Sequence, residues 1–486
     1  MTQGHTLRIR LASGLGLAAL VLGTTAGQAK PVIQPLPVAT ASPGDTPESI
    51  LPPVAPPSAS PTTKAAPAPI AIPGPASAGG NATVTPPVAM IPVPVVEPVM
   101  NWKLADAQAL LASIQAVDEE GLIAADYQAQ ALSAALAVGE GPALDDQASR
   151  SMAWLIEDLR DGRTPMPARV QWFALDPDQD TMPTTVIMAK ALETHDIAGT
   201  LAALDPTHPD YAVLKETLAA TPKAERATRA LIRANMDRWR WLAHDLGHQY
   251  LITNVPEFQL RLTVNNSIVR TYRTIVGKPG RTATPQLAEQ VQAVVFNPTW
   301  TVPQSIVVGE GMGAKFAGNP AAALRQGYKV TKSADGTITI VQQPGPNNSL
   351  GLMKIDMPNA HAIYLHDTPN RQLFNAPVRA FSHGCVRTER ASELGMTMAI
   401  LGAGMTPEQG VANATSGKYT RVTMAKSFPV YITYFTMAQD ITGKLTSFND
   451  LYGRDVPVLA SFNQPRQVKT TQRVSNEAII KLDNPL

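Results

Sequence analysis

Ala380-Phe381-Ser382-His383-Gly384-Cys385-Val386-Arg387 is the stretch around which this 486-residue chain is organised. It contains Cys385, the single cysteine of the sequence, which therefore has no partner for a disulfide within the chain. The preceding glycine lets the backbone come close to a substrate. Histidine and arginine beside a thiol typically lower its pKa and increase the thiolate fraction. These neighbours predict a chemically active thiol.

A second histidine lies upstream, in Tyr364-Leu365-His366-Asp367-Thr368-Pro369. A cysteine, a histidine and a polar orienting group are the parts of a nucleophilic site, in which the thiolate attacks a carbonyl carbon and forms a thioester. His366 ends an expected strand over 362–365, so it can approach the thiol from a separate element. His383 is only two residues from the cysteine, and its side chain would often point elsewhere. We therefore expect His366 to be the base.

The Ser-His-Gly-Cys turn presents successive backbone amides, which is how an oxyanion hole is built. The expected donors are the amides of His383, Gly384 and Cys385. A metal site is not expected, because one cysteine with scattered histidines lacks ligand spacing. The residues call for no cofactor.

Structural explanations compete with these catalytic ones. A lone buried cysteine is commonly a small hydrophobic residue. The His366-Asp367 pair could serve as a strand-end cap. Arg387 could simply pair with Asp367 or Glu389.

The overall composition limits the classes of partner. The formal charge is +1, from 40 basic and 39 acidic residues, so there is no electrostatic case for nucleic acid. Apolar residues make up 44% of the chain, which allows a sizeable core, and the length predicts two or three domains.

The N-terminus has the pattern of an export signal. Arg8 and Arg10 precede an apolar run over 11–22, and Ala26-Gly27-Gln28-Ala29 offers small residues for cleavage after Ala29. Residues 1–29 are therefore predicted to be a signal peptide, which places the protein in the periplasm. The alternative is an uncleaved membrane anchor.

Residues 30–99 are rich in proline and alanine, with very few charges. Such a segment lacks the backbone donors for a helix or sheet and favours extended polyproline II. It is predicted to be a disordered linker, either a spacer that gives a tethered domain its reach or a tail with no length requirement.

The remaining chain predicts an α+β protein with two folded parts. Apolar residues recur at helical spacing through 100–243, which predicts an all-α helical scaffold domain. The period changes to two from Gln249, and alternation over 258–264 and 268–276 predicts a hairpin within a β-rich catalytic domain at 244–456. Residues 302–332 are weakly patterned, and a segment of about 302–345 is either a flap over the site or a surface excursion. Residues 457–486 are expected to be a polar C-terminal extension.

The upstream histidine with its nearby threonine, followed by Ser-x-Gly-Cys-x-Arg, resembles the catalytic signature of the L,D-transpeptidase (YkuD-type) domain. Further motifs are similar to the large YcbB-type branch. They include Asn235-Met236-Asp237-Arg238-Trp239-Arg240-Trp241, Asn254-Val255-Pro256, Val276-Gly277-Lys278-Pro279, and segments 297–303, 343–346, 364–369, 381–387, 429–431 and 450–455. The likeness covers most of 101–456.

The resemblance implies a peptidoglycan-remodelling enzyme that contributes to cell-wall organisation and cell shape. Cys385 would attack a donor stem peptide between an L- and a D-centre, and the amine of an acceptor stem would resolve the thioester. The family assigns the base to His366, with its ring oriented by the backbone carbonyl of Asp367. Ser382, Arg387, Tyr364 and Thr368 would bind substrate or support the site. Acylation of the cysteine by carbapenems is also implied.

One departure from the branch concerns the substrate. The usual inserted peptidoglycan-binding module has no room between the helical region and 235–241, so docking must rest on other surfaces. A 3,3 cross-link is favoured, while a 1,3 cross-link uses the same chemistry. The alternatives are an L,D-carboxypeptidase or endopeptidase, in which water resolves the thioester, and a non-catalytic wall-binding scaffold protein.

Overall fold

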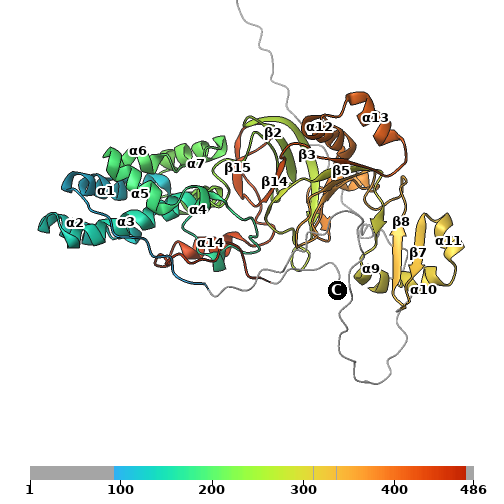
Figure 1. Cartoon of the computed structure of the whole chain (residues 1–486), viewed down its shortest axis with the longest axis horizontal. Coiled ribbons are helices and arrows are strands. Elements are labelled where there is room, and N and C mark those ends of the chain that lie inside the picture. The colour runs from blue at the N-terminus through green and yellow to red at the C-terminus, as the bar shows by residue number, and fades with distance from the viewer. Residues whose placement is uncertain (1–91, 310, 335, 478–486) are drawn as a thin grey trace, which may run out of the picture. The chain divides into compact units, whose positions relative to one another are not determined.

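The computed structural model of the protein describes residues 92–477 except 310 and 335. The predicted signal peptide and most of the predicted linker lie outside the described residues. Within the described part, no helix is both long and apolar enough to cross a membrane. A helical region is followed by a β-rich region (Figure 1), which confirms the predicted α+β class.

The helical region packs around apolar stripes. Its helices are α1 (Leu104–Ala116), α2 (Ala129–Val138), α3 (Pro142–Asp161), α4 (Asp178–Thr181), α5 (Thr184–Thr194), α6 (Ile197–Ala202), α7 (Pro209–Ala220) and α8 (Arg226–Trp239), with short 3-10 turns at Val117–Glu120, Ala124–Tyr127 and Met166–Ala168. Leu110 and Ile114 of α1 pack with Leu155 of α3 in one buried cluster. Gly162 ends α3 with a φ of 82°, where a side chain would be strained. The predicted helices are therefore confirmed.

The β-rich region is built on one large sheet. Its strands are β1 (Gln249–Asn254), β2 (Gln259–Val264), β3 (Ser267–Gly277), β4 (Leu287–Gln290), β5 (Ala293–Phe296), β9 (Met353–Asp356), β10 (Leu365–His366), β11 (Ala380–Ser382), β12 (Val386–Thr388), β13 (Thr420–Thr423) and β14 (Pro429–Thr433). The order is β13-β5-β9-β10-β12-β3-β2-β1-β14-β4, and β11 also pairs with β3. The predicted hairpin is the antiparallel β2–β3 pair, with Leu260 opposite Tyr272.

Other elements flank this sheet. They are α12 (Ala391–Ala403), α13 (Pro407–Thr415), the β15 (Met437–Gln439) and β16 (Leu445–Ser447) hairpin, α14 (Asp455–Ser461) and a 3-10 turn at Arg371–Asn375. Leu394 and Met398 of α12 join Val294, Met353 and Leu365 in the core of the sheet, so the central strands are covered by apolar side chains. This core holds β10 and β12 in place.

The segment predicted as a flap or a surface excursion is a folded unit, which we call the inserted subdomain (300–342). It contains β6 (Trp300–Thr301), α9 (Gln304–Gly309), α10 (Met312–Ala317), α11 (Pro320–Arg325), β7 (Tyr328–Lys332) and β8 (Ile338–Gln342), grouped together in Figure 1. Its strands pair in the order β6-β8-β7. Val307, Phe316 and Ile340 form a small core of its own.

Buried polar contacts join the helical region to the catalytic domain. The Asn235 side chain accepts a hydrogen bond from the Thr436 amide at 2.9 Å. Arg238 pairs with Asp455 at 2.6 Å, and both groups are largely buried. The motif at 235–241 is therefore an interface between the two parts.

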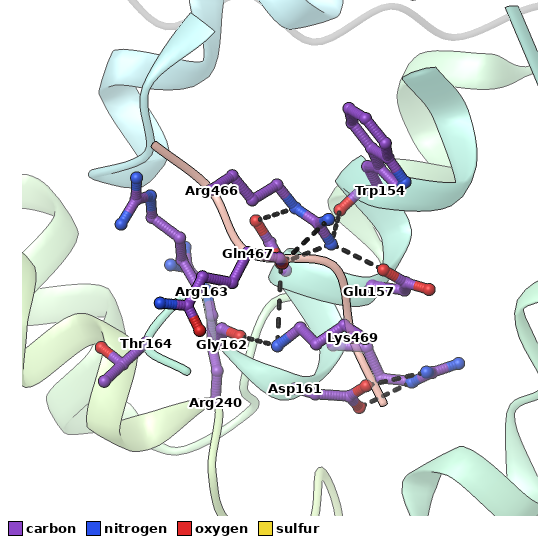
Figure 2. A network of polar contacts seen from close by, with 12 residues as sticks. Trp154, Glu157, Asp161, Gly162, Arg163, Thr164, Arg240, Arg466, Gln467 and Lys469 are labelled. Carbon is purple, nitrogen blue, oxygen red and sulfur yellow. Dashed lines mark hydrogen bonds and ion pairs between the residues drawn. The ribbon is translucent and has the colours of Figure 1, made fainter. Parts of the chain in front are cut away.

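The end of the chain differs from the predicted polar extension. The predicted boundary at 457 falls inside α14, and the residues after this helix, 462–477, run back along the helical region as what we call the C-terminal strap. Figure 2 shows Arg466 and Lys469 of the strap lying against the end of α3. Arg466 pairs with Glu157 at 2.6 Å and with Asp158 at 2.9 Å, and Lys469 donates to the Gly162 carbonyl. These basic residues neutralise buried acids distant in sequence.

The strap also pairs with the end of the predicted linker. The Val95 amide donates to the Lys469 carbonyl, and the Thr471 amide donates to the Val93 carbonyl, both at 3.0 Å. Pro94 and Thr470 form an antiparallel bridge between these bonds. Residues 93–95 therefore belong to the folded structure.

Candidate active site

The two strands that carry the candidate residues lie side by side. β10 and β12 are parallel, with Leu365 opposite Val386 and His366 opposite Arg387. Leu365 and Val386 are fully buried in the core of the sheet. Because side chains alternate between the faces of a strand, His366 and Arg387 share the other face. Cys385 immediately precedes β12, beside the carbonyl of Tyr364, which accepts from the Val386 amide at 3.1 Å.

Ser382 folds the turn that presents the thiol. Its hydroxyl donates to the Cys385 carbonyl at 2.6 Å and accepts from the Gly384 amide at 3.1 Å. Gly384 has a φ of +118°, and a β-carbon there would lie 3.2 Å from the side chain of Ile363. The turn therefore needs a small hydroxyl residue and a glycine at these two places.

The predicted oxyanion donors are not equivalent. The Gly384 amide is already engaged by Ser382. No hydrogen bond from the amides of His383 or Cys385 is present within the described residues. These two amides remain available to a developing oxyanion. His383 is an exposed residue, and partial desolvation of its ring, together with the charges of Lys278 and Arg387, lowers its pKa.

His366 is held by the backbone carbonyl that the family resemblance implies. Its Nδ1 lies 2.5 Å from the Asp367 carbonyl oxygen. Donation from Nδ1 leaves Nε2 without a proton and able to accept one. Burial, together with the charges of Arg387 and Lys354, lowers the pKa of His366 to about 3, although the Asp367 carbonyl opposes this. The imidazole is therefore neutral near neutral pH.

The thiol environment corrects the expectation of a ready thiolate. Burial raises the pKa of Cys385 to about 11, and contacts with Tyr364 and the charges of Lys354 and Arg387 reduce this shift only in part. The Sγ atom lies 3.7 Å from the Ala362 carbonyl oxygen. The residues next to Cys385 in the sequence predict a lowered pKa, but the pKa is raised because desolvation of the thiolate outweighs the effect of the nearby cations. Thiol and imidazole are both neutral at rest, which suits proton transfer during the attack.

The other predicted residues have identifiable contacts. The Asp367 carboxylate accepts from the Leu352 amide at 2.9 Å and pairs with Arg371 at 3.3 Å. Buried Thr368 accepts from the Asn370 amide at 3.2 Å, so it shapes the loop after β10. The Tyr364 side chain contacts the Cys385 thiol and Trp300 of β6, which brings the inserted subdomain to the site.

The structural explanation of Arg387 is wrong. Asp367 pairs with Arg371, and Glu389 pairs with Arg273 at 2.5 Å. Within the described part of the chain, no carboxylate lies within ion-pair distance of Arg387. Its charge is thus uncompensated on the face that carries His366.

The structure also adds residues that sequence reasoning missed. Phe173, from the loop before α4, packs against His361 with ring centroids 4.1 Å apart and ring planes tilted by 44°. Together with Gln171 and Thr282 these side chains line a small cleft beside His383 and Gly384. The loop has no periodic pattern that could have predicted this. Lys354 was also missed, although apolar and charged residues alternate in Met353-Lys354-Ile355-Asp356, a pattern that is typical of a strand.

A thiol at the start of β12, a neutral imidazole on the neighbouring strand β10 and free backbone amides at the turn of the thiol together define a site for nucleophilic acyl transfer. Residues 248–395 match the L,D-transpeptidase catalytic domain, and residues 101–218 match the Scaffold domain. The chain therefore carries a Scaffold domain followed, towards the C-terminus, by a YkuD-type L,D-transpeptidase catalytic domain. This confirms the resemblance of the catalytic signature to the YkuD-type domain.

Related proteins agree with this assignment. The chain is 30% identical over 232 residues to a protein of Haemophilus influenzae that is itself only provisionally named an L,D-transpeptidase. The match covers 44% of this chain and 47% of the relative, so the chain spans about half the length of that protein.

Similar solved structures include two L,D-transpeptidases. The enzyme from Mycobacterium smegmatis is 12% identical, with 38% of this chain and 58% of that chain covered and a TM-score of 0.20. A mutant of the enzyme from Enterococcus faecium is 14% identical, with 38% and 50% covered and a TM-score of 0.20.

Proposed function

We propose that this protein is a peptidoglycan L,D-transpeptidase that joins stem peptides through a Cys385 thioester. The observation that carries the proposal is the pair formed by His366, fixed through Asp367, and the thiol on the adjacent strand. The catalytic-domain match over 248–395 supports it independently. Donor and acceptor stem peptides are the partners, and no cofactor takes part.

The proposed reaction has two half-steps. The Cys385 sulfur bonds to a carbonyl carbon between an L- and a D-centre while His366 accepts the thiol proton. The peptide C–N bond then breaks, and the same proton passes to the leaving amine. An acceptor amine attacks the thioester, gives its proton to His366, and releases the thiolate, which is reprotonated. The amides of His383 and Cys385 stabilise the negative oxygen in each half-step.

The finer parts of the proposal rest on the sequence. The motifs at 235–241 and 450–455 support placement in the YcbB-type branch, and both contribute to the interface through Arg238 and Asp455. We propose a 3,3 cross-link, with a 1,3 cross-link as the second product to test. The pattern of residues 1–29 supports export to the periplasm, and N-terminal sequencing of the mature protein tests cleavage after Ala29.

Mass spectrometry of purified muropeptides incubated with the enzyme tests this function. Cross-linked dimers should form with the wild type and with Lys190→Met, a change on the exposed face of α5, and should be absent with Cys385→Ala. Fragmentation of the dimers gives the linkage. Release of the terminal residue without dimers would instead identify the carboxypeptidase alternative. Wall binding without any product would favour the non-catalytic alternative.

A second test uses acylation. One L,D-transpeptidase structure is a complex with imipenem. We propose that a carbapenem acylates Cys385 of this chain. Intact-protein mass should increase by one adduct in the wild type and not in Cys385→Ala. An unmodified wild type would oppose an acylable thiol.

A further inference from the structure

Lys354 stands in a charged row across the sheet. It lies opposite His366 in the antiparallel β9–β10 pair, and His366 lies opposite Arg387 in the β10–β12 pair. Paired residues share a face of the sheet, so the three side chains project to the same side. Two strand spacings separate the backbones of the two cations by about 10 Å, and their long side chains flank the imidazole.

The row carries more positive than negative charge. Lys354 is 3.2 Å from Asp356, but the other oxygen of that carboxylate is 3.1 Å from Arg421. The Asp356 carboxylate is thus shared by two cations, Lys354 and Arg421, whereas no carboxylate pairs with Arg387 among the described residues. The Lys354 side chain remains 26% exposed, so part of it faces solvent. If Lys354 served only in a structural ion pair, this excess of positive charge would not be expected.

The row also lies against the reacting groups. The Lys354 ammonium is 4.6 Å from the centre of the Tyr364 ring, and the Tyr364 side chain contacts the thiol. After burial, which dominates both shifts, Arg387 and Lys354 each lower the pKa of His366 and of Cys385. An anion bound between the two cations would therefore sit beside the imidazole.

The proposed reaction supplies such an anion. The leaving amine receives its proton from His366, and in a leaving amino acid the α-carboxylate is attached to the same carbon as that amine. If the leaving group were a peptide joined onward through the α-carboxyl of its first residue, a neutral amide would occupy this place. The position of the cations on either side of the proton donor thus matches a leaving residue whose α-carboxylate is free, as it is in a single terminal amino acid.

We propose that Lys354 and Arg387 form a carboxylate-binding subsite that recognises the free C-terminal carboxylate of the leaving residue on the donor stem. This proposal rests on the proposed function and narrows its donor to a stem that ends one residue beyond the scissile bond. Lys354 binds the substrate in this scheme and takes no part in proton transfer.

Alkylation of Cys385 tests the subsite without any peptide substrate. The rates with anionic iodoacetate and neutral iodoacetamide are measured on the full chain, and their ratio cancels the thiolate fraction. Lys354→Met should lower this ratio by about threefold or more, because a cation whose charge acts on the thiol is lost. Lys354→Arg should keep it, and so should Lys190→Met on α5. An unchanged ratio in Lys354→Met would overturn the proposal.

Two synthetic tetrapeptide donors, one ending in a carboxylate and one in a carboxamide, supply the second test. The wild type should prefer the acid in kcat/KM, and Lys354→Met and Arg387→Met should lose that preference mainly through KM for the acid. A preference that survives both substitutions contradicts the subsite. If the wild type consumes neither donor, the proposed function fails, whereas the alkylation ratio still decides the subsite. Melting curves verify that each variant is folded.

Discussion

Alkylation of Cys385 by iodoacetamide should become faster with pH up to and beyond pH 10. Only the thiolate reacts, and burial raises the pKa of this thiol to about 11. The rate should therefore increase about tenfold per pH unit through the neutral range. The resting enzyme would keep its nucleophile protonated until substrate arrives.

The size of the effect follows from the two pKa values. At about pH 7.5, an ordinary thiol with a pKa of about 8.5 is about 10% ionised, whereas one with a pKa of about 11 is about 0.03% ionised. Native Cys385 should thus react about 300-fold more slowly than the same residue in the unfolded chain. Restricted access would slow it further without changing the slope with pH.

The assay is simple because the chain has one cysteine. Single-adduct formation is followed by intact-protein mass between about pH 6 and 10.5, in buffer and in concentrated urea. A rate that levels off below pH 8 in the native protein would refute the reasoning, because it would reveal a thiolate paired with a charged His366.

A neutral imidazole is also expected to keep the acylation rate by a carbapenem flat down to about pH 5, well above the His366 pKa of about 3.

Three further outcomes follow from buried groups. The wild type should lose about 2 kcal/mol of unfolding free energy relative to Cys385→Ala as pH rises from 9 to 11, because the raised thiol pKa lets the unfolded chain release that proton first; equal pH slopes in urea titrations would contradict this. Arg466→Met should cost about 3–5 kcal/mol by removing the buried ion pair of Glu157 and one of the two cations at Asp158, whereas Arg150→Met, which removes an exposed pair with Asp146, should cost at most about 0.5 kcal/mol in the same titration. Ser382→Ala should cost about 1–3 kcal/mol and slow carbapenem acylation, because the Gly384 amide loses its acceptor; an unchanged acylation rate would show that the turn does not depend on this hydroxyl.

The elements with strong periodicity were predictable from the sequence. Alternation over 258–264 gives β2 because Leu260 and Leu262 on one face of that strand pack in the core of the sheet, although Arg261 and Thr263 on the other face are also buried. The stripe with Leu155 and Leu159 gives α3, which buries the same residues. His366 and Cys385 could be paired because the chain places each at the end of a short strand motif.

The remaining features depend on contacts between distant residues. The inserted subdomain escaped prediction because its strands and helices are two to six residues long, too short for a periodic signal. The C-terminal strap looked like a tail because the acids that Arg466 neutralises lie on α3. The pKa of Cys385 was mispredicted because desolvation is set by the folded surroundings, whereas sequence shows only adjacent residues.

The C-terminal strap also sets the order in which the protein can be completed. Asp158 and the Arg466 that neutralises it are 308 residues apart in the chain. At about 5–20 residues per second, a ribosome needs about 15–60 s to add that length. During this interval the helical region lacks the counter-ions for two acids that are buried in the finished fold. The first domain to be synthesised is therefore the last to be stabilised, and a chain truncated before Arg466 should leave it vulnerable to proteolysis.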